Sequence, residues 1–575
     1  MPTQTVDLRK EFPRRFVADH ADMGDWPQIA PYFERLTARD LNSPDDLERW
    51  LEDMSELSAC IDEAESDRYV AMTCQTDDPE REKRFLDFVE NVTPKCKPNW
   101  HKLYERYAAC THAAELPTTR YEVLDRSIRN QVALYRDENV PLETEDEKLR
   151  QTYEKTVGAM TVEFDGTEQT LPQMGRYQEE PDRDLRRRAW ESTTERRLAD
   201  ADKLDELFDQ MIALRTTIAR NAGYDSYRDY VFSLYERFDY APEDCRNFHD
   251  SIEELVVPLL RTRQAKRREQ LGVDQLRPWD LTVDPKGRAA LKPFTTGGEL
   301  RDGCSRLFHR ISPELGEQFD RLGEADMLDL ESRKGKAPGG YQCCFDEQRM
   351  PFIFMNAVGL QRDVETLIHE GGHAFHSFAV RDEPIHAYRS APIEFCEVAS
   401  MSMELLALPH LDEFYPDADA LRRARRQQLE GVVTVLPWIA TIDAFQHWLY
   451  THPDHTRQER QDTWLATLER FGGDVDWTGL DRAKAYRWQA QLHLYRVPFY
   501  YVEYGIAQVG ALGMWTRSQQ DAAQAVTDYR TALALGGSRP LPELFSAAGV
   551  RFDFSAPVLR PLIETLTDAL NELDE

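Results

Sequence analysis

The chain has 575 residues, and 41% of them are hydrophobic, so it is long enough to bury a sizeable core. Its formal net charge of -32 and its pI of about 4.9 argue against nucleic acid and anionic membranes as partners. Of the 71 basic residues, 57 are Arg. Such an acidic, Lys-poor composition suits either a salt-rich cytoplasm, where screening relieves self-repulsion, or simply a well-solvated surface.

Cysteine usage and the first residues indicate the compartment in which the protein works. There are nine cysteines, none of them in a CxxC pair, and only Cys343 and Cys344 are adjacent. We therefore predict reduced thiols in a cytoplasmic protein. The opening stretch MPTQTVDLRKEFPRRF lacks the apolar segment of a secretory signal. No apolar run approaches the roughly 18 residues of a membrane span.

Helical periodicity dominates the first part of the chain. Amphipathic stretches fill residues 25–135, and Ser43 is placed to cap one of these helices, with acidic residues in the turn that follows. We predict an N-terminal helical hairpin or bundle region over residues 1–125 and a larger helical domain over residues 126–575. The fold class is mostly α.

A few segments break the helical pattern. TVEFDGTEQTLP, residues 161–172, predicts a β-hairpin with Asp165–Gly166 at its turn. LRPWDLTVDPKGR, residues 276–288, is typical of an irregular connection. MPFIFMN, residues 350–356, predicts a strand. It lies shortly before a segment rich in histidine, so we expect a small sheet beside that segment.

The histidine segment is DVETLIHEGGHAFHSF, residues 363–378. Its apolar residues recur at helical spacing, and Asp363 is a plausible N-cap. His369 and His373 are four residues apart and therefore face the same way on the helix. Two imidazoles in this arrangement can bind one Zn²⁺ at about 2.0–2.1 Å each. The alternative is a solvated helix face with incidental histidines.

The three residues between these histidines favour a catalytic metal site. Glu370 follows the first histidine and can accept a proton from the attacking water without itself binding the metal. Gly371 and Gly372 each cost roughly 1 kcal/mol relative to Ala inside a helix, so something requires them. We expect the close approach of a strand or of a substrate backbone.

A third metal ligand is needed, and several residues compete for the role. His376 lies about 300° around the helix from His373, so we expect it to support a ligand or to be packed. The segment APIEFCEVASMSMELL offers Glu397 and Glu404, which share a helix face; one can bind the metal while the other holds a ligand histidine by its free N–H. Glu394 competes with Glu397, and spacing alone does not choose between them.

Together these motifs resemble those of the thimet oligopeptidase and oligoendopeptidase F family of zinc metallopeptidases. HEGGH is followed 24 residues after its second histidine by Glu397 in CEVASMSMELL, and Glu404 lies seven residues further on. The likeness extends upstream through GKAPGGYQCCF and PFIFMN, and downstream to HLYRVPFYYVEYGIAQVGALGMW, so it spans about residues 330–515. The resemblance implies that His369, His373 and Glu397 bind one Zn²⁺ per chain.

The resemblance also implies a source of hydrogen-bond donors for the tetrahedral oxyanion. In the family a His and several Tyr from a Gly-containing loop supply them. The matching positions are His493, Tyr501 and Tyr504, with Tyr500 as a neighbouring candidate. Tyr501 and Tyr504 keep the three-residue step of the family.

Substrate binding is expected at the predicted strand and the segment before it. The strand at residues 350–356 is either interior or an edge strand that pairs with an extended peptide, and the resemblance favours the edge. The preceding PGGYQ is either an ordinary turn or a segment that closes over the substrate, with Gly339 and Gly340 as its flexible point. Expected contacts with the substrate are Gly339, Gly340, Tyr341 and Tyr500.

The resulting prediction is a zinc-dependent endopeptidase that hydrolyses short, unfolded peptides. The family fold implied by the resemblance is a large, helical, two-lobed peptidase with a deep central channel and a small sheet beside the HExxH helix. Residues 126–575 then form the catalytic domain, with the metal-site core at about 330–515. Two alternatives are a metallocarboxypeptidase, for which Arg389 or Arg496 would hold a terminal carboxylate, and a non-catalytic peptide-binding scaffold.

Overall fold

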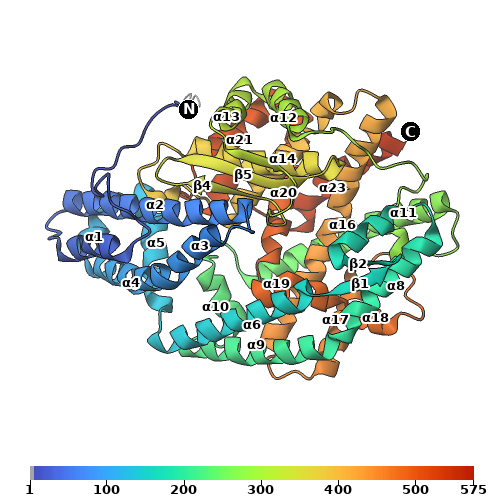
Figure 1. Ribbon diagram of the computed structural model, residues 1–575, viewed down its shortest axis with the longest axis horizontal. Helices are drawn as coiled ribbons and strands as arrows, with labels where there is room; N and C mark the ends of the chain where they lie inside the picture. Colours follow the sequence, from blue (N-terminus) through green and yellow to red (C-terminus); the bar gives the residue numbers. More distant parts are fainter. Residues whose placement is uncertain (1–5, 575) are drawn as a thin grey trace. The chain divides into compact units, whose positions relative to one another are not determined.

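A computed structural model describes residues 6–574, and helices dominate it (Figure 1). The predicted fold class, mostly α with a small sheet beside the histidine helix, is confirmed. None of the described helices is both long and apolar enough to cross a membrane. All nine cysteines are free of disulfide bonds.

The chain divides into two compact units, each built from segments distant in sequence. Unit 1 comprises residues 1–133, 291–425 and 506–552, and unit 2 comprises residues 134–290, 426–505 and 553–575. The predicted division into residues 1–125 and 126–575 stays a prediction. Two long helices, α16 (Ala418–Thr451) and α20 (Tyr501–Ser518), begin in one unit and end in the other.

Unit 1 opens with a helical region whose caps follow from sequence. Ser43 accepts a hydrogen bond from the backbone N–H of Asp46 and caps α2, as predicted. The helices of this region are α1 (Trp26–Ala38), α2 (Pro44–Cys74), α3 (Pro79–Asn91), α4 (Thr93–Ala109) and α5 (Thr118–Leu134). The later elements of the unit are α12 (Gly297–Ile311), α13 (Pro313–Glu324), β3 (Leu328–Glu331), β4 (Tyr341–Phe345), β5 (Met350–Ala357), α14 (Gln361–Ala379), α15 (Ile393–Leu406), α21 (Ala522–Leu533) and α22 (Leu541–Ala547).

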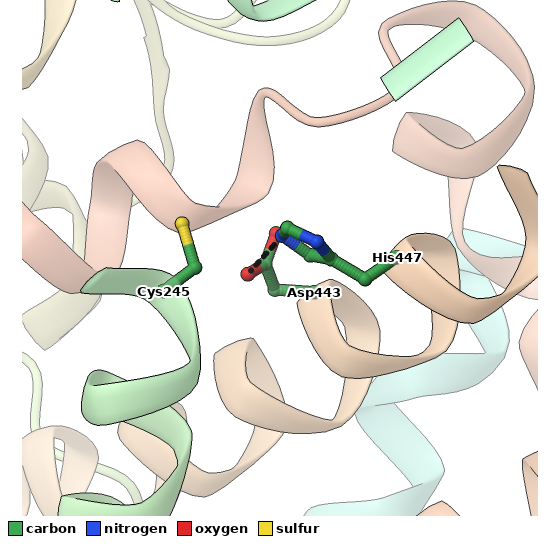
Figure 2. A group of neighbouring side chains, drawn as sticks. All are labelled: Cys245, Asp443 and His447. Carbon is green, nitrogen blue, oxygen red and sulfur yellow. Dashed lines mark ion pairs between the residues drawn. The ribbon is translucent and has the colours of Figure 1, made fainter. Parts of the chain in front are cut away.

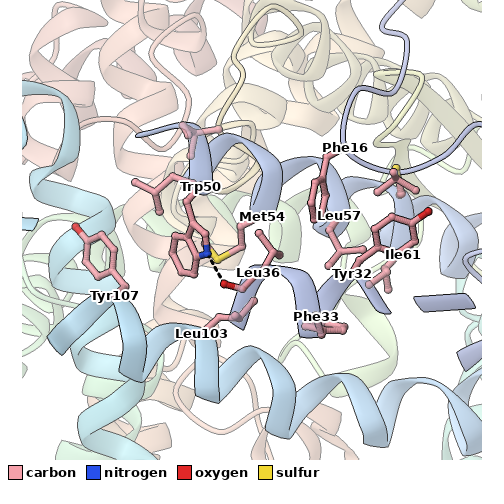
Figure 3. Close-up of a cluster of buried hydrophobic side chains, with 14 of the residues drawn as sticks. Phe16, Tyr32, Phe33, Leu36, Trp50, Met54, Leu57, Ile61, Leu103 and Tyr107 are labelled. Carbon is pink, nitrogen blue, oxygen red and sulfur yellow. Dashed lines mark hydrogen bonds between the residues drawn. The ribbon is translucent and has the colours of Figure 1, made fainter. Parts of the chain in front are cut away.

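A cluster of buried apolar side chains holds the N-terminal helices together (Figure 3). Trp50 is fully buried at its centre, and its indole N–H donates to the backbone carbonyl of Leu36 at 3.0 Å, so this buried N–H group is satisfied. Phe33 meets Trp100 edge to face at 4.7 Å. The alternation of apolar and charged residues read from the sequence thus corresponds to a real core.

The sheet beside the histidine helix has the strand order β3-β5-β4. Strand β5 is central, because it pairs in parallel with β3 and antiparallel with β4. The expectation that residues 350–356 form an edge strand is therefore wrong, and the alternative of an interior strand is right. The reason is local: YQCCF folds back as β4 and takes the edge. Strand β5 is almost wholly buried and packs against α14 (Figure 1).

Unit 2 contains the predicted hairpin and a second set of helices. Strands β1 (Thr161–Phe164) and β2 (Thr167–Thr170) pair antiparallel, and Asp165 and Gly166 both have positive φ at the turn. The segment 276–288 is irregular apart from one short 3₁₀ turn, as predicted. The helices are α6 (Val140–Gly158), α7 (Leu171–Met174), α8 (Arg183–Ala199), α9 (Ala201–Asn221), α10 (Tyr227–Leu234), α11 (Pro242–Leu271), α17 (Arg457–Phe471), α18 (Asp481–Ala485), α19 (Leu492–Arg496) and α23 (Ala556–Asp574).

Candidate functional site

The histidine helix α14 starts three residues earlier than predicted. Its N-cap is Leu360, so Asp363 lies inside the first turn and the N-cap assignment is wrong. The carboxylate nevertheless does the work of a cap, since it accepts backbone hydrogen bonds from Val358, Gly359 and Leu360 at 2.8 to 2.9 Å. A single side chain thus fixes where the helix begins and, through it, the direction in which its histidines point.

The two glycines of HEGGH let other elements approach α14 closely. A Cβ added at Gly372 would lie 2.6 Å from the Cα of Ser400 and 2.7 Å from the carbonyl oxygen of Ala399, both in the backbone of α15. A Cβ at Gly371 would lie 2.8 Å from the ring of Phe308 in α12. The expected close approach exists, but the partner at Gly372 is a helix rather than a strand or a substrate.

This contact brings a carboxylate from α15 to the two histidines of α14. The Nε2 of His369 lies 3.5 Å from Oε2 of Glu397, and the Nε2 of His373 lies 3.8 Å from the same oxygen. Donors bound to one tetrahedral Zn²⁺ at about 2.0–2.1 Å are about 3.4 Å apart, so these separations fit one ion. The three residues form one of the two groups of potential metal ligands among residues 6–574.

Neighbouring side chains orient these three donors. Glu404, one of the two glutamates expected near the metal, accepts from Nδ1 of His369 at 2.7 Å and so turns Nε2 toward Glu397. Ser400 donates to Oε2 of Glu397 at 3.1 Å. Ser400 is not among the predicted site residues, although a Ser three residues after a Glu on a helix is within reach of its carboxylate.

The site holds its ionisable groups in unequal states. Burial lowers the pKa of His373 well below its usual range, so this ring is neutral and ready to bind a metal. Burial also opposes a charge on His369, but the hydrogen bond to Glu404 and the nearby carboxylates outweigh it and raise the pKa of His369 to about 9. A metal that binds here displaces a proton from His369.

Glu370 is buried beside these donors but is not one of them. Its side chain is 7% exposed, and burial raises the pKa of Glu370 to about 7, against the opposing effect of His369. The backbone N–H of Gln342 in edge strand β4 acts in the opposite direction to burial and favours the charged carboxylate. A carboxyl group with a pKa near neutrality can both accept and return a proton, as a general base requires.

The two other candidate ligands lie outside the cluster of three donors. His376 is 4% exposed, its Nδ1 faces Sγ of Cys396 at 3.8 Å, and burial lowers the pKa of His376 to about 4. It is a packed residue one turn from His373. Glu394 is buried on α15 but does not belong to the cluster, which contains Glu397 instead.

The expected oxyanion donors gather in unit 2 as four aromatic rings. The ring centroid of His493 lies 4.7 Å from that of Tyr501 and 5.9 Å from that of Tyr504, and Tyr500 lies 5.4 Å from Tyr504. Gln491 donates to Nδ1 of His493 at 2.7 Å, which leaves the ring proton on Nε2. Burial lowers the pKa of His493 to about 4, so this donor is neutral.

A strained turn positions these rings. Phe499 is fully buried with φ of +67°, which is unusual for a residue other than glycine. Its N–H donates to Oε1 of Gln446 at 2.7 Å, and its carbonyl accepts from Arg237, which also pairs with Glu503 at 2.7 Å. These contacts fix the turn that starts α20, immediately before Tyr500.

The same turn rests on a buried cluster that the sequence analysis did not single out (Figure 2). Cys245 projects from α11, and Asp443 and His447 project from α16; all three are buried. Both oxygens of Asp443 are engaged: Oδ2 accepts from His249 and Oδ1 accepts from Gln446, each at 2.8 Å. Because Gln446 also holds Phe499, we assign this cluster a supporting role for the turn.

Three of the four residues expected to contact substrate lie at the start of the edge strand β4, and the fourth, Tyr500, lies immediately before α20. Tyr341 stacks on Phe354 at 4.8 Å, and its hydroxyl is 2.6 Å from Oγ1 of Thr73. Gly339 has φ of +100°, which favours glycine, and its carbonyl accepts from Asn356. Gly340 follows it. Their contact with a substrate stays a prediction.

Comparison with known proteins shows similarity to peptidases. The model of the family described as "Peptidase family M3" matches residues 176–563. Oligopeptidase PepF of Bacillus subtilis (strain 168) is 23% identical over 327 residues, which cover 56% of this chain and 47% of that protein. An oligoendopeptidase F homolog of Borreliella burgdorferi is 23% identical over 305 residues, which cover 50% of this chain and 49% of that protein. These matches span about half the length of the two curated relatives.

Similarity to solved structures covers nearly the whole chain. The structure described as PZ peptidase A with inhibitor 2 has a TM-score of 0.87 and 27% sequence identity, and the match covers 97% of this chain and 100% of that one.

Proposed function

Because the chain belongs to peptidase family M3, whose members are zinc metallopeptidases, we propose that it is a zinc-dependent oligoendopeptidase that hydrolyses short peptides. The observation that carries this proposal is the convergence of two imidazole nitrogens and one carboxylate oxygen, beside a buried glutamate whose pKa is about 7. A purely structural cluster would not require that fourth residue.

The donor set fits one Zn²⁺ per chain. Two imidazoles and a carboxylate are common ligands of catalytic zinc, and their mutual distances suit a tetrahedral ion with one open position. When bound there, zinc supplies a Lewis acid that makes water a nucleophile at neutral pH. In the proposed roles, His369, His373 and Glu397 hold the ion, and Glu404 fixes the orientation of His369.

The remaining roles belong to side chains that act on the peptide. Glu370 takes a proton from the attacking water and later delivers it to the leaving amine. Tyr504, with Tyr501 and His493, donates hydrogen bonds to the developing oxyanion. Strand β4 pairs with β5 on one side, and the backbone groups on its other side have no neighbouring strand in the sheet. This free edge supports the proposal that an extended substrate pairs with β4.

A peptide library of graded length tests the proposed function. Products are identified by mass spectrometry, with and without a chelator, and with both termini of the peptides free or blocked. We expect chelator-sensitive internal cleavage of blocked peptides. Cleavage that stops when the C-terminus is blocked would favour the metallocarboxypeptidase, and a folded protein without stoichiometric zinc and without cleavage would favour the scaffold. Arg389 and Arg496, the basic residues considered for the carboxypeptidase, are already engaged with Asp346 and Glu154.

Replacing Glu397 tests the choice between the two glutamates of α15. Glu397→Ala removes one of three metal donors, so its zinc content should fall well below one ion per chain. Glu394→Ala should retain about one ion per chain, as expected for a closed set of three protein ligands. Elemental analysis of the folded, gel-filtered proteins measures both, and the reverse pattern would show that the wrong carboxylate has been chosen.

Replacing Tyr504 tests the oxyanion donors. Tyr504→Phe keeps the ring that packs on His493 and removes only the hydroxyl, so kcat should fall about 100-fold with little change in KM. Steady-state kinetics on one blocked peptide measures both constants. An unchanged kcat would remove Tyr504 from the oxyanion role and leave Tyr501 and His493 as the donors to examine.

A further inference from the structure

Unit 2 contains a cavity of about 690 Å³ that none of the roles above uses. Its volume lies within the range of about 300–1,000 Å³ typical of small-ligand sites. Three tryptophans line it: Trp190 from α8, Trp438 from α16 and Trp477 from the loop before α18. Their rings provide flat apolar walls against which the methylene groups of a flexible ligand can pack.

Two arginines line the same cavity without a carboxylate partner among the described residues. Arg197 comes from α8, and Arg487 follows α18 and lies over Trp438 and Trp477, 4.4 and 5.8 Å from their ring centroids. In the described part of the chain, neither guanidinium makes a hydrogen bond or an ion pair. Arg197 is half-buried, and burial lowers the pKa of its guanidinium. Arg487 is exposed to solvent, so its guanidinium is accessible to a ligand that enters the cavity.

Three fully buried arginines of unit 2 are already engaged with carboxylates, in the ion pairs Arg215–Asp146, Arg186–Asp280 and Arg460–Asp205. Within residues 6–574, Arg197 and Arg487 have no such ion pair and remain available to a ligand.

The cavity lining is net positive in a chain with a net charge of -32. Arg261 and Lys484 also line it, against the two carboxylates of Glu469 and Asp474. Since the rest of the protein repels anions, a local excess of positive charge with three aromatic walls is a specific feature.

The cavity is linked to the aromatic cluster through Trp438. The indole N–H of Trp438 donates to Oε1 of Gln491 at 3.1 Å, and Gln491 donates in turn to Nδ1 of His493 at 2.7 Å. A ligand against Trp438 therefore lies two hydrogen bonds from a side chain that we assign to the reaction.

We propose that this cavity is a subsite for a carboxylate of the peptide substrate, which Arg197 and Arg487 bind while the tryptophans pack against the chain that carries it. The inference rests on the proposed function, because it takes a peptide as the ligand. The carboxylate belongs to an acidic side chain or to the C-terminus. A planar guanidinium suits either, because it binds a carboxylate through two parallel hydrogen bonds.

A peptide series separates the two sources of carboxylate. The reference peptide is blocked at both ends and contains no acidic residue; one set scans a single Glu against Gln through each position, and another frees the C-terminal carboxylate. In the wild-type enzyme we expect at least one Glu position, or the free C-terminus, to raise kcat/KM about tenfold over the reference, as for a charge-assisted contact. Equal kcat/KM values for all peptides would overturn the subsite.

Arginine variants test which side chains are responsible. The ratio to compare is kcat/KM for the carboxylate-bearing peptide divided by kcat/KM for the reference peptide. Arg487→Gln and Arg197→Gln should each bring this ratio toward one. Arg220→Gln on α9 removes an equal charge from an exposed side chain that does not line the cavity, so it should keep the wild-type ratio. A ratio that survives both cavity variants would contradict the proposal.

Binding without turnover distinguishes failure of the subsite from failure of the proposed function. In the Glu370→Gln background, isothermal titration calorimetry measures binding of the same peptides. We expect tighter binding of the carboxylate-bearing peptide, and loss of this preference when Arg487→Gln is added. If the wild-type enzyme cleaves no peptide but the Glu370→Gln variant still prefers the carboxylate-bearing peptide, the subsite stands and the peptidase proposal fails. If the wild-type enzyme cleaves all peptides equally and the variant binds them equally, the peptidase proposal stands and the subsite fails.

Discussion

Glu370→Gln should retain zinc and lower kcat by about 1,000-fold or more. The change replaces a proton acceptor with an isosteric amide that cannot take a proton from water, and general bases of this kind contribute about 10²–10⁴-fold. A second loss adds to the first, because the same carboxyl group is proposed to protonate the leaving amine. Steady-state kinetics on a blocked peptide, with zinc content measured on the same samples, checks the prediction.

A matched control lies on the same helix. Glu365 is also a glutamate of α14 whose pKa burial raises to about 7, and it accepts a hydrogen bond from Gln361 at 2.9 Å without belonging to the donor cluster. Glu365→Gln should leave kcat within a few-fold of the wild type. If Glu370→Gln retains substantial turnover, or if both variants lose it equally, Glu370 is not the general base.

Gly372→Ala should destabilise the protein and empty the metal site, although alanine is the better helix former. Propensity alone predicts a gain of about 1 kcal/mol. The new methyl group would lie 2.6 and 2.7 Å from backbone atoms of Ser400 and Ala399, and the backbone of α15 cannot rotate away. Overpacking of this kind costs about 1–3 kcal/mol, and more where backbone must shift. We expect a lower unfolding temperature and a reduced zinc content.

Gly371→Ala is the matched comparison. It adds the same methyl group one residue earlier, where the obstacle is the ring of Phe308, a side chain that can adjust. Its unfolding temperature should lie between those of the wild type and Gly372→Ala, and its zinc content should stay near that of the wild type. Wild-type stability and full zinc content in Gly372→Ala would show that the close approach of α14 and α15 does not build the site.

Much of the candidate metal site could be predicted from sequence because its chemistry is local. His369 and His373 lie one helical turn apart, and their convergence follows from helix geometry alone. Glu397 and Glu404 also share one helix face, so the sequence could predict that one approaches the metal and the other a histidine. Which of them does so depends on how α15 lies across α14, which no spacing within one helix contains.

The start of α14 and the place of strand 350–356 in its sheet depend on tertiary contacts, which local sequence patterns do not contain. The sequence predicts Asp363 as an N-cap, yet its carboxylate acts from within the first turn. The strand at residues 350–356 was expected at an edge, and YQCCF took that place instead. In both cases the sequence predicts the local role, a backbone-bonding carboxylate and a strand, but not the neighbouring segment with which each one pairs.

The turn that positions the aromatic cluster of His493, Tyr500, Tyr501 and Tyr504 also depends on distant residues. The resemblance indicated His493, Tyr501 and Tyr504 as the donors, but the turn that positions them could not be anticipated. Phe499 carries no sequence signal for a positive φ, since glycine or asparagine would be the usual residue there. Its conformation is held by Gln446 and Arg237, more than 50 residues away in sequence.

An X-ray anomalous difference map at the zinc edge tests the proposed metal centre most directly. Crystals grown with one equivalent of zinc should show a single strong peak between Nε2 of His369, Nε2 of His373 and a carboxylate oxygen of Glu397, and the peak should disappear in Glu397→Ala. A map without density at that position, from protein that cleaves peptides under the same conditions, would contradict the assignment of these three side chains as the catalytic metal site.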